Sequence, residues 1–256
     1  MTLAGDRGAG VPGGIRPRDL LTAELTKIRT TPAARLAAAG ALLAHILLGL
    51  LAATDVVRLA GRDGHVAIAE LGTVLLAPAY LLVVVPVLAA GNEYRGGQLR
   101  VSLAAVPGRG RYFAAKLLAT TAVTAAAAVG VVAPGYLVRH ALANADGVPA
   151  TPGGILTRSA GYLLLGLIGF GLAVLTRTIV TPLAVLSCAP VLVSTTLGGI
   201  VPGLVRLLPH EAALSFLGMP ASPELTLDPA AGLLVLAGWA VVAVGAAGTA
   251  VARRDS

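Results

Sequence analysis

Cysteine, lysine and recognisable catalytic motifs are scarce in this chain of 256 residues. The single cysteine, Cys188, excludes a disulfide framework and a cysteine metal site within one chain, and we expect it to be a small buried residue. The two lysines, Lys27 and Lys116, belong to no G-x-x-x-x-G-K-S/T phosphate loop, and the sequence contains no H-E-x-x-H motif. We therefore expect no enzyme activity, no bound cofactor and no metal on this chain.

Carboxylates are also rare in the long apolar stretches. Of the 12 acidic residues, only Glu70 falls within such a stretch, near its end. An intramembrane carboxylate is the usual device for coupling transport to protons or sodium, and it is costly to keep in a membrane without a function. The sequence therefore disfavours an ion-coupled carrier.

Apolar residues, in contrast, are abundant. They make up 56% of the chain, charged residues make up 12%, and the mean hydropathy is +0.86, which is typical of an integral membrane protein. Crossing a hydrocarbon core of roughly 30 Å takes about 20 apolar residues of helix. The sequence predicts an all-α membrane protein with six transmembrane helices, at 33–53, 66–90, 114–138, 155–175, 179–201 and 230–252.

The distribution of basic residues predicts how these helices are oriented. Lys and Arg near the ends of spans are retained on the cytoplasmic side. With the N-terminus inside, fourteen of the 19 basic residues face the cytoplasm. We expect both termini to be cytoplasmic in a multi-pass protein of the cell (plasma) membrane, and the net charge of +7 then requires no nucleic-acid partner.

Ahead of the first span, the sequence predicts a disordered cytoplasmic head over 1–18 and a single transmembrane domain over 19–256. Within this domain a short helix is expected at 19–30, ending before Pro32. Such a helix suits the inner membrane surface, and a plain extension of the first span into the cytosol is the alternative. Its apolar side carries Leu20, Leu21, Leu25 and Ile28, and its polar residues include Glu24, Lys27 and Arg29.

The loop between the second and third predicted spans, 91–116, is basic and punctuated by glycine: GNEYRGGQLRVSLAAVPGRGRYFAAK. A short amphipathic helix is expected at 98–106, ended by Pro107. Gly108 and Gly110 then predict a flexible turn that carries Arg109 and Arg111. This segment is a candidate docking site for a partner, and the alternative is a solvated loop whose arginines only set the topology.

The residues of this loop resemble those of the permeases of type 2 ABC transporters. The pattern is a Glu soon after the second span, a Gly-rich step, L-R-x-S-L-A-A-V-P-x-R-x-R, and a Lys at the start of the third span, within a six-span layout. Where many such permeases have Thr after the Gly, this chain has Gln98, a poorer helix cap than a hydroxyl residue. The matching residues are Glu93, Gly96, Gly97, Leu99, Arg100, Ser102, Leu103, Ala104, Ala105, Val106, Pro107, Arg109, Arg111, Ala115 and Lys116.

The resemblance implies a transmembrane permease subunit that associates with membrane lipid, a second permease copy or paralogue, and two cytosolic ABC ATPase subunits. ATP hydrolysis would then occur on the partner, and the loop 91–116 would couple it to export. The implied ATPase-coupling residues are Asn92, Glu93, Tyr94, Arg95, Gln98, Arg100, Arg109 and Arg111, with Glu24, Lys27 and Arg29 of the interfacial helix beside them.

Other functions and details remain open at this level. One alternative is a non-transporting accessory or immunity protein of the same architecture, and a weaker one is an ion-coupled secondary carrier made of two inverted three-span halves. The segment 202–229 suits either a re-entrant structure in the outer leaflet or an interfacial loop. Neither the substrate nor the choice between homodimer and heterodimer is encoded in a recognisable motif.

Overall fold

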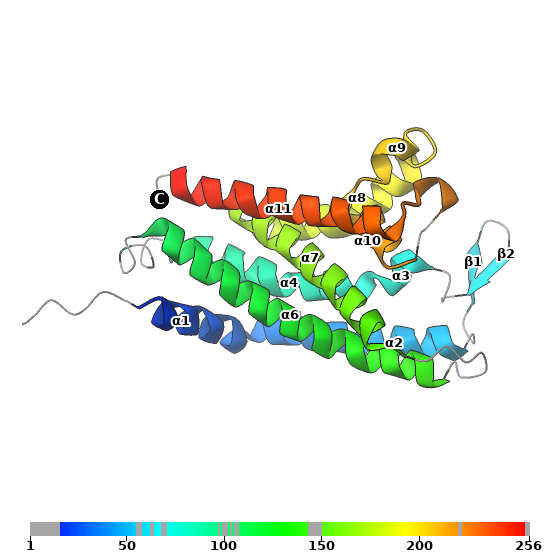
Figure 1. The fold of residues 1–256 in the computed structure, drawn as a ribbon, viewed down its shortest axis with the longest axis horizontal. Coiled ribbons are helices and arrows are strands. Elements are labelled where there is room, and N and C mark those ends of the chain that lie inside the picture. Colours follow the sequence, from blue (N-terminus) through cyan, green and yellow to red (C-terminus); the bar gives the residue numbers. More distant parts are fainter. Residues whose placement is uncertain are drawn as a thin grey trace, which may run out of the picture.

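Long apolar helices make up most of the computed structural model (Figure 1). Their order along the chain begins with α1 (Pro17–Thr30), α2 (Pro32–Thr54), the strands β1 (Arg58–Gly61) and β2 (Gly64–Ala67), α3 (Gly72–Leu75), α4 (Ala77–Gly91) and the 3-10 helix η2 (Asn92–Tyr94). It continues with α6 (Arg109–Leu142), α7 (Pro152–Thr176), α8 (Val180–Leu197), α9 (Pro202–Val205), α10 (Pro209–Phe216), the 3-10 helix η3 (Pro223–Leu225) and α11 (Pro229–Arg253). The structure describes residues 16–54, 58–61, 64–67, 71–96, 98, 102, 104, 108–142, 150–219 and 222–253.

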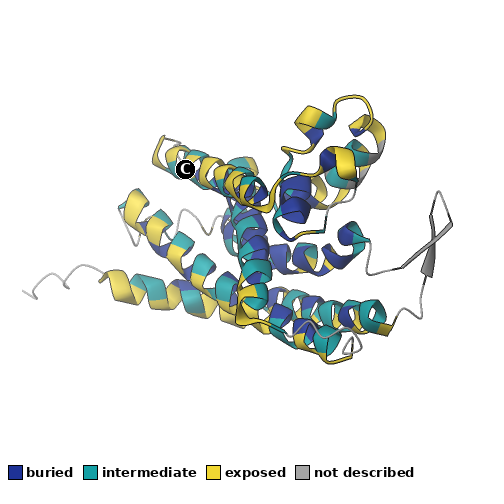
Figure 2. Cartoon of the chain, turned by 45° about the vertical axis from the view of Figure 1, so that its right-hand side comes forward, coloured by how far each residue is buried: buried dark blue, intermediate teal, exposed yellow. Residues whose placement is uncertain are grey.

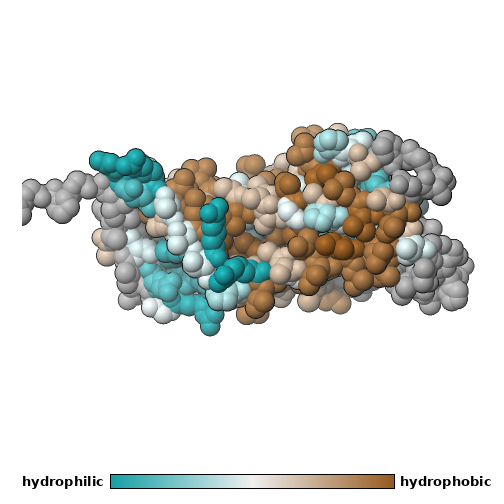
Figure 3. Space-filling view, turned by 90° about the horizontal axis from the view of Figure 1, so that it is seen from below, coloured by the Kyte–Doolittle hydropathy of each residue, from teal (hydrophilic) through white to brown (hydrophobic). Residues whose placement is uncertain are grey.

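Five of the helical segments are long and apolar enough to cross a membrane: Pro32–Thr54, Gly72–Tyr94, Arg109–Leu142, Pro152–Thr176 and Pro229–Arg253. This confirms the prediction of a helical, multi-pass membrane protein. The remaining predicted span, 179–201, coincides with α8, which is shorter. Figure 3 shows the corresponding apolar belt, bounded by hydrophilic residues at the end where α1 lies.

The predicted start of the second span was wrong. That span was placed at 66–90, but residues 64–67 form β2, which pairs in antiparallel fashion with β1 so that Arg58 lies opposite Ala67. The apolar helix begins only at Gly72. A run of small and β-branched residues at 66–69 is apolar enough to extend a hydropathy window, yet such residues are equally compatible with a strand.

The N-terminal helix also differs from its prediction. It begins at Pro17, two residues earlier than expected, because proline is favoured in the first turn of a helix. Thr31 has an extended backbone, with φ of −71° and ψ of 112°, so α1 and α2 are separate helices. The alternative in which α1 simply extends the first span is therefore wrong. Most of the predicted head, residues 1–15, lies outside the described residues.

Helices α4 and α7 form the centre of the bundle (Figure 2). In each of their apolar stretches more than 60% of the residues are buried, against 11% for α2 and 28% for α11. Close helix contacts depend on small residues. At the crossing of α2 and α6, a Cβ on Gly49 would lie 2.6 Å from the carbonyl oxygen of Gly135, so the two backbones touch there.

The two ends of the bundle differ in structure. Figure 1 shows α1 and the C-terminal end of α11 at one end, and β1, β2 and α9 at the other. At this second end the predicted loop 202–229 forms α9, α10 and η3. Residues 210–215 of α10 are all buried, and α10 packs mainly on α11.

Candidate functional site

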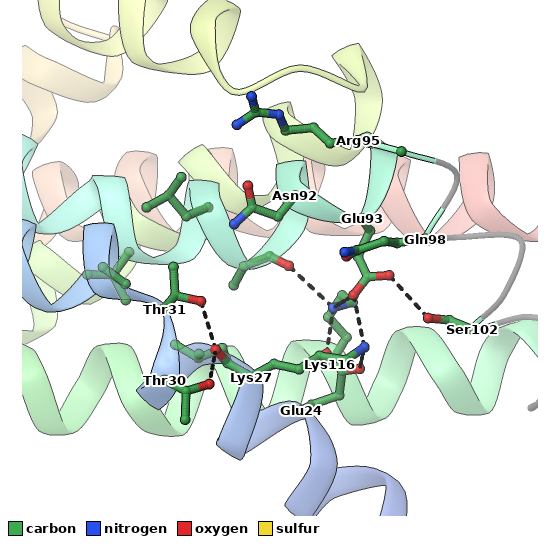
Figure 4. A pocket seen from close by; sticks show the side chains of 16 residues that line it. Glu24, Lys27, Thr30, Thr31, Asn92, Glu93, Arg95, Gln98, Ser102 and Lys116 are labelled. Atoms are coloured by element: carbon green, nitrogen blue, oxygen red, sulfur yellow. Dashed lines mark hydrogen bonds and ion pairs between the residues drawn. The ribbon is translucent and has the colours of Figure 1, made fainter.

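Four charged side chains meet at the end of the bundle that contains α1 (Figure 4). Glu24 and Lys27 come from α1, Glu93 from η2, and Lys116 from the second turn of α6. Three segments that are far apart in the sequence are thereby joined by one cluster of ion pairs, which we call the four-charge cluster.

Lys116 is at the centre of the four-charge cluster. Its Nζ donates hydrogen bonds to Glu24 Oε2 at 2.5 Å, to Glu93 Oε1 at 3.0 Å and to the carbonyl oxygen of Ala89 at 3.3 Å. All three protons of the ammonium group therefore have acceptors. The side chain is only 6% exposed and passes over the ring of Tyr112, with Nζ 5.4 Å from its centroid.

Lys27 completes the neutralisation of the two carboxylates. Its Nζ donates to Glu24 Oε1 at 2.8 Å and to Glu93 Oε1 at 3.1 Å, and its side chain is about half exposed, at 48%. Burial disfavours its charge, but the hydrogen bonds and the charges of Glu24 and Glu93 outweigh this effect and raise the pKa of Lys27 above its ordinary value. Two cations and two anions give the four-charge cluster no net charge.

The helical periodicity of α1 explains how the cluster forms. Glu24 and Ile28 are four residues apart, so they share one face, and both are buried against the bundle, where α1 packs on α6. This corrects the sequence-based expectation, which assigned Glu24 to the polar side of the helix. A buried carboxylate is costly unless it is paired. The partners on η2 and α6 thus fix the docking of α1.

A pocket of about 660 Å³ lies beside the four-charge cluster (Figure 4). The loop 91–116 also contributes Ser102 to this pocket, and Ser102 Oγ donates a hydrogen bond to Glu93 Oε2 at 3.3 Å. Residues of the loop 91–116 and of the N-terminal helix, which are predicted from the sequence to lie side by side, line this one pocket. Its polar lining consists of Glu24, Lys27, Thr30, Thr31, Asn92, Glu93, Arg95, Gln98, Ser102 and Lys116.

Three other predicted coupling residues that the structure describes, Tyr94, Arg109 and Arg111, are not part of the lining of this pocket. The guanidinium carbon of Arg177, between α7 and α8, lies 5.9 Å from the centroid of the Tyr94 ring. Arg109 and Arg111 are in the first turn of α6, so the expected flexible turn was wrong: the helix already starts at Arg109. Arg29 is exposed on α1.

Much of the predicted coupling helix, 98–106, lies outside the described residues, and so does Arg100. The positions that are described, Gln98, Ser102 and Ala104, are helical. The prediction for the rest of the segment stays a prediction.

Sequence reasoning missed one member of the site, Lys116, and one residue that contacts Tyr94, Arg177. Lys116 matched the family pattern but was not assigned to the site, although its position inside a predicted span was a signal that it needs a buried partner. Arg177 carries the one positive φ, 55°, among described residues other than glycine. Because L-residues rarely adopt this conformation, the strained turn marks a position that packing must hold in place. No sequence feature indicated it.

The chemistry available at this site is that of recognition. Its groups are two carboxylates, two ammonium groups, two amides, three hydroxyls and Arg95 at the rim. In the part of the chain that the structure describes, no three His, Cys, Asp or Glu side chains are grouped to hold a metal ion. The exposed groups at its rim, Arg95 and Gln98, can form hydrogen bonds with a polar ligand.

Comparison with known proteins adds no family: no protein-family model and no curated protein matches this chain.

Proposed function

We propose that this protein is the transmembrane permease subunit of an ATP-driven ABC exporter in the cell membrane. It forms the translocation path and is coupled to a separate ATPase subunit through the loop 91–116. A second permease copy or paralogue completes the path. The observation that carries this proposal is the joining of the loop, α1 and α6 around the four-charge cluster.

The four-charge cluster supports a mechanical role for this end of the bundle. A force applied to η2 by a partner reaches α6 through Glu93 and Lys116, and it reaches α1 through Lys27. Because α6 and α4 are long apolar helices, a displacement at this end extends into the proposed translocation path. Arg95 and Gln98, both exposed and on the rim of the pocket, are available to contact the partner.

The proposed topology has six spans, with α8 as the fifth span and both termini in the cytoplasm. Two observations support it. The described N-terminal helix and the end of α11 lie at the same end of the bundle (Figure 1). The same end carries Lys27, Arg29, Arg95, Arg109 and Lys116, and positive charge is retained on the cytoplasmic side.

The proposal is tested by purifying the tagged full chain from its native membranes in mild detergent. The expected result is co-purification of an ABC ATPase with vanadate-sensitive ATP hydrolysis. Arg95→Glu, which reverses an exposed charge at the rim of the pocket, should abolish this capture. Arg206→Glu is the matched control, since Arg206 is also exposed but lies next to α9 at the opposite end of the bundle.

Capture that survives Arg95→Glu and Glu93→Lys, with unchanged expression, would contradict the coupling role. A clean preparation that contains no ATPase would contradict the transporter proposal itself and would favour the accessory-protein alternative.

A further inference from the structure

A second cavity lies within the apolar part of the bundle. Its lining is far less polar than the lining of the pocket beside the four-charge cluster. Its volume is about 340 Å³, within the range of roughly 300–1,000 Å³ typical of ligand sites. It is lined by residues of α4, α7, α8, α10 and α11, and nearly all of them are apolar. Both α8 and α11 line this cavity, yet they are not among the closely packed helix pairs of the described chain, so the cavity occupies the space between them.

The residues that line the cavity follow two helices over several turns. Its lining extends from Leu165 to Leu175 on α7, which corresponds to about 15 Å at 1.5 Å per residue. On α8 the lining extends from Val185 to Val193, about 12 Å by the same rise. A cavity of this volume with this apolar lining has room for one extended hydrocarbon chain.

The polar groups on the lining are already paired with protein atoms. Tyr80 and His210 are hydrogen-bonded to each other, with 2.5 Å between Tyr80 Oη and His210 Nδ1. Trp239 Nε1 donates to the carbonyl oxygen of Leu207 at 2.8 Å. An occupant therefore meets a hydrocarbon surface and has little hydrogen bonding to gain.

The cavity opens sideways on the apolar surface of the bundle. Among its lining residues, Val185, Trp239 and Val242 are exposed by 46%, 42% and 63%. These residues lie in the middle parts of α8 and α11, and α11 is one of the helices that can span a membrane. The medium at the opening is therefore lipid hydrocarbon, which fixes the class of occupant.

We propose that the space between α8 and α11 is a binding site for one acyl chain of a membrane phospholipid, which enters sideways from the bilayer. The acyl chain lies along α7 and fills a cavity whose lining atoms would otherwise lack van der Waals partners. This inference does not rest on the proposed transport function, because the site contains no residue of the four-charge cluster.

The chain carries its own probe for this site, because Trp239 is the only tryptophan. The purified full chain in detergent is titrated with a phosphatidylcholine that is brominated in the middle of its acyl chains, and Trp239 fluorescence is followed. We expect quenching that saturates at one lipid per chain, with no effect of the unbrominated lipid. Val242→Phe and Val185→Phe, which fill the cavity from two different helices, should weaken binding by roughly tenfold or more, since one methylene in an apolar pocket is already worth that much.

Val241→Phe is the matched control, because Val241 is next to Val242 and is 71% exposed but does not line the cavity. It should leave the titration unchanged. Quenching that rises without saturation and to the same extent in all variants would overturn the proposal, because it would report only contact of Trp239 with bulk lipid. Absence of quenching would also overturn it, in favour of a second copy of the chain covering the opening.

Discussion

Lys116 Nζ lies 2.5 Å from Glu24 Oε2, although the two residues are 92 positions apart in the chain. Both side chains are almost fully buried, at 6% and 2% exposure. An ion pair in this environment does not tolerate the loss of one partner, because the remaining charge has no water to solvate it. The stability of this end of the bundle therefore depends on the three buried members of the four-charge cluster, Glu24, Glu93 and Lys116.

The first prediction concerns this dependence. Lys116→Met leaves the buried carboxylates of Glu24 and Glu93 with Lys27 as the only cation of the four-charge cluster, and we expect a loss of about 3–5 kcal/mol of stability. Arg95→Gln, on the exposed rim, should change stability by less than about 0.5 kcal/mol. The measurement is thermal unfolding in detergent. In the double variant with Glu93→Gln, the two losses should not add, because the partners share one network. Strict additivity would refute the cluster.

The second prediction concerns the contact between α2 and α6. A methyl group on Gly49 would lie 2.6 Å from the carbonyl oxygen of Gly135, so Gly49→Ala forces the helices apart and should cost about 1–3 kcal/mol. Gly40, also on α2, is the matched control, because a Cβ added there would meet no atom within 4 Å. Gly40→Ala should be neutral or stabilising by up to about 1 kcal/mol, because alanine favours helix. Equal melting temperatures of both variants would exclude the close contact.

The third prediction is a pH dependence that arises from His210. Burial lowers the pKa of His210 from 6.5 to about 4, so between these values the unfolded chain binds more protons than the folded one. Stability should be complete above pH 6.5 and should fall as the pH is lowered towards 4, by up to about 3 kcal/mol. In His210→Gln the loss of stability over this pH range should be smaller by this amount. Unfolding of the parent chain and of the variant is measured between about pH 4 and 7.5, and an equal slope in both would exclude the contribution of His210.

The fourth prediction addresses the proposed fifth span. Cys188 is exposed on α8, which contradicts the expectation of a buried core residue. If α8 lies in the membrane, the exposed thiol faces lipid, where a charged reagent dissolved in water does not reach it. In intact membranes a charged maleimide should therefore modify Cys188 far more slowly than a cysteine introduced by Arg206→Cys in a Cys188→Ala background. After dissolution in denaturant the two rates should converge. Rapid labelling of Cys188 in membranes would exclude α8 as a span.

The sequence was sufficient for the elements whose signal is local. Apolar runs of membrane-spanning length located α2, α6, α7 and α11 to within a few residues, because hydrocarbon thickness constrains helix length directly. The pattern failed at 66–71, where a short apolar segment before Gly72 looked like helix but partly forms β2. Small apolar residues do not by themselves distinguish the two structures.

The sequence identified residues of the candidate site, but it did not predict which groups surround them in the fold. Glu24, Lys27 and Glu93 were predicted as polar contacts for a partner, whereas the structure pairs them mainly with one another and with Lys116. A pairing between α1 and α6 depends on how the helices pack, and a single sequence holds no local signal for it. The same limitation applies to the cavity between α8 and α11, which exists because two apolar helices fail to meet.

The separation between Glu24 and Lys116 also sets an order of events during biosynthesis. Ribosomes add roughly 5–20 residues per second, so about 5–18 seconds pass between the synthesis of Glu24 and that of Lys116, which is 92 residues downstream. Throughout that interval α1 and α2 exist without α6, the helix on which both of them pack. A nascent chain that stalls before residue 116 therefore leaves Glu24 with Lys27 of its own helix as a partner, but without the buried ammonium group that fixes α1 on α6.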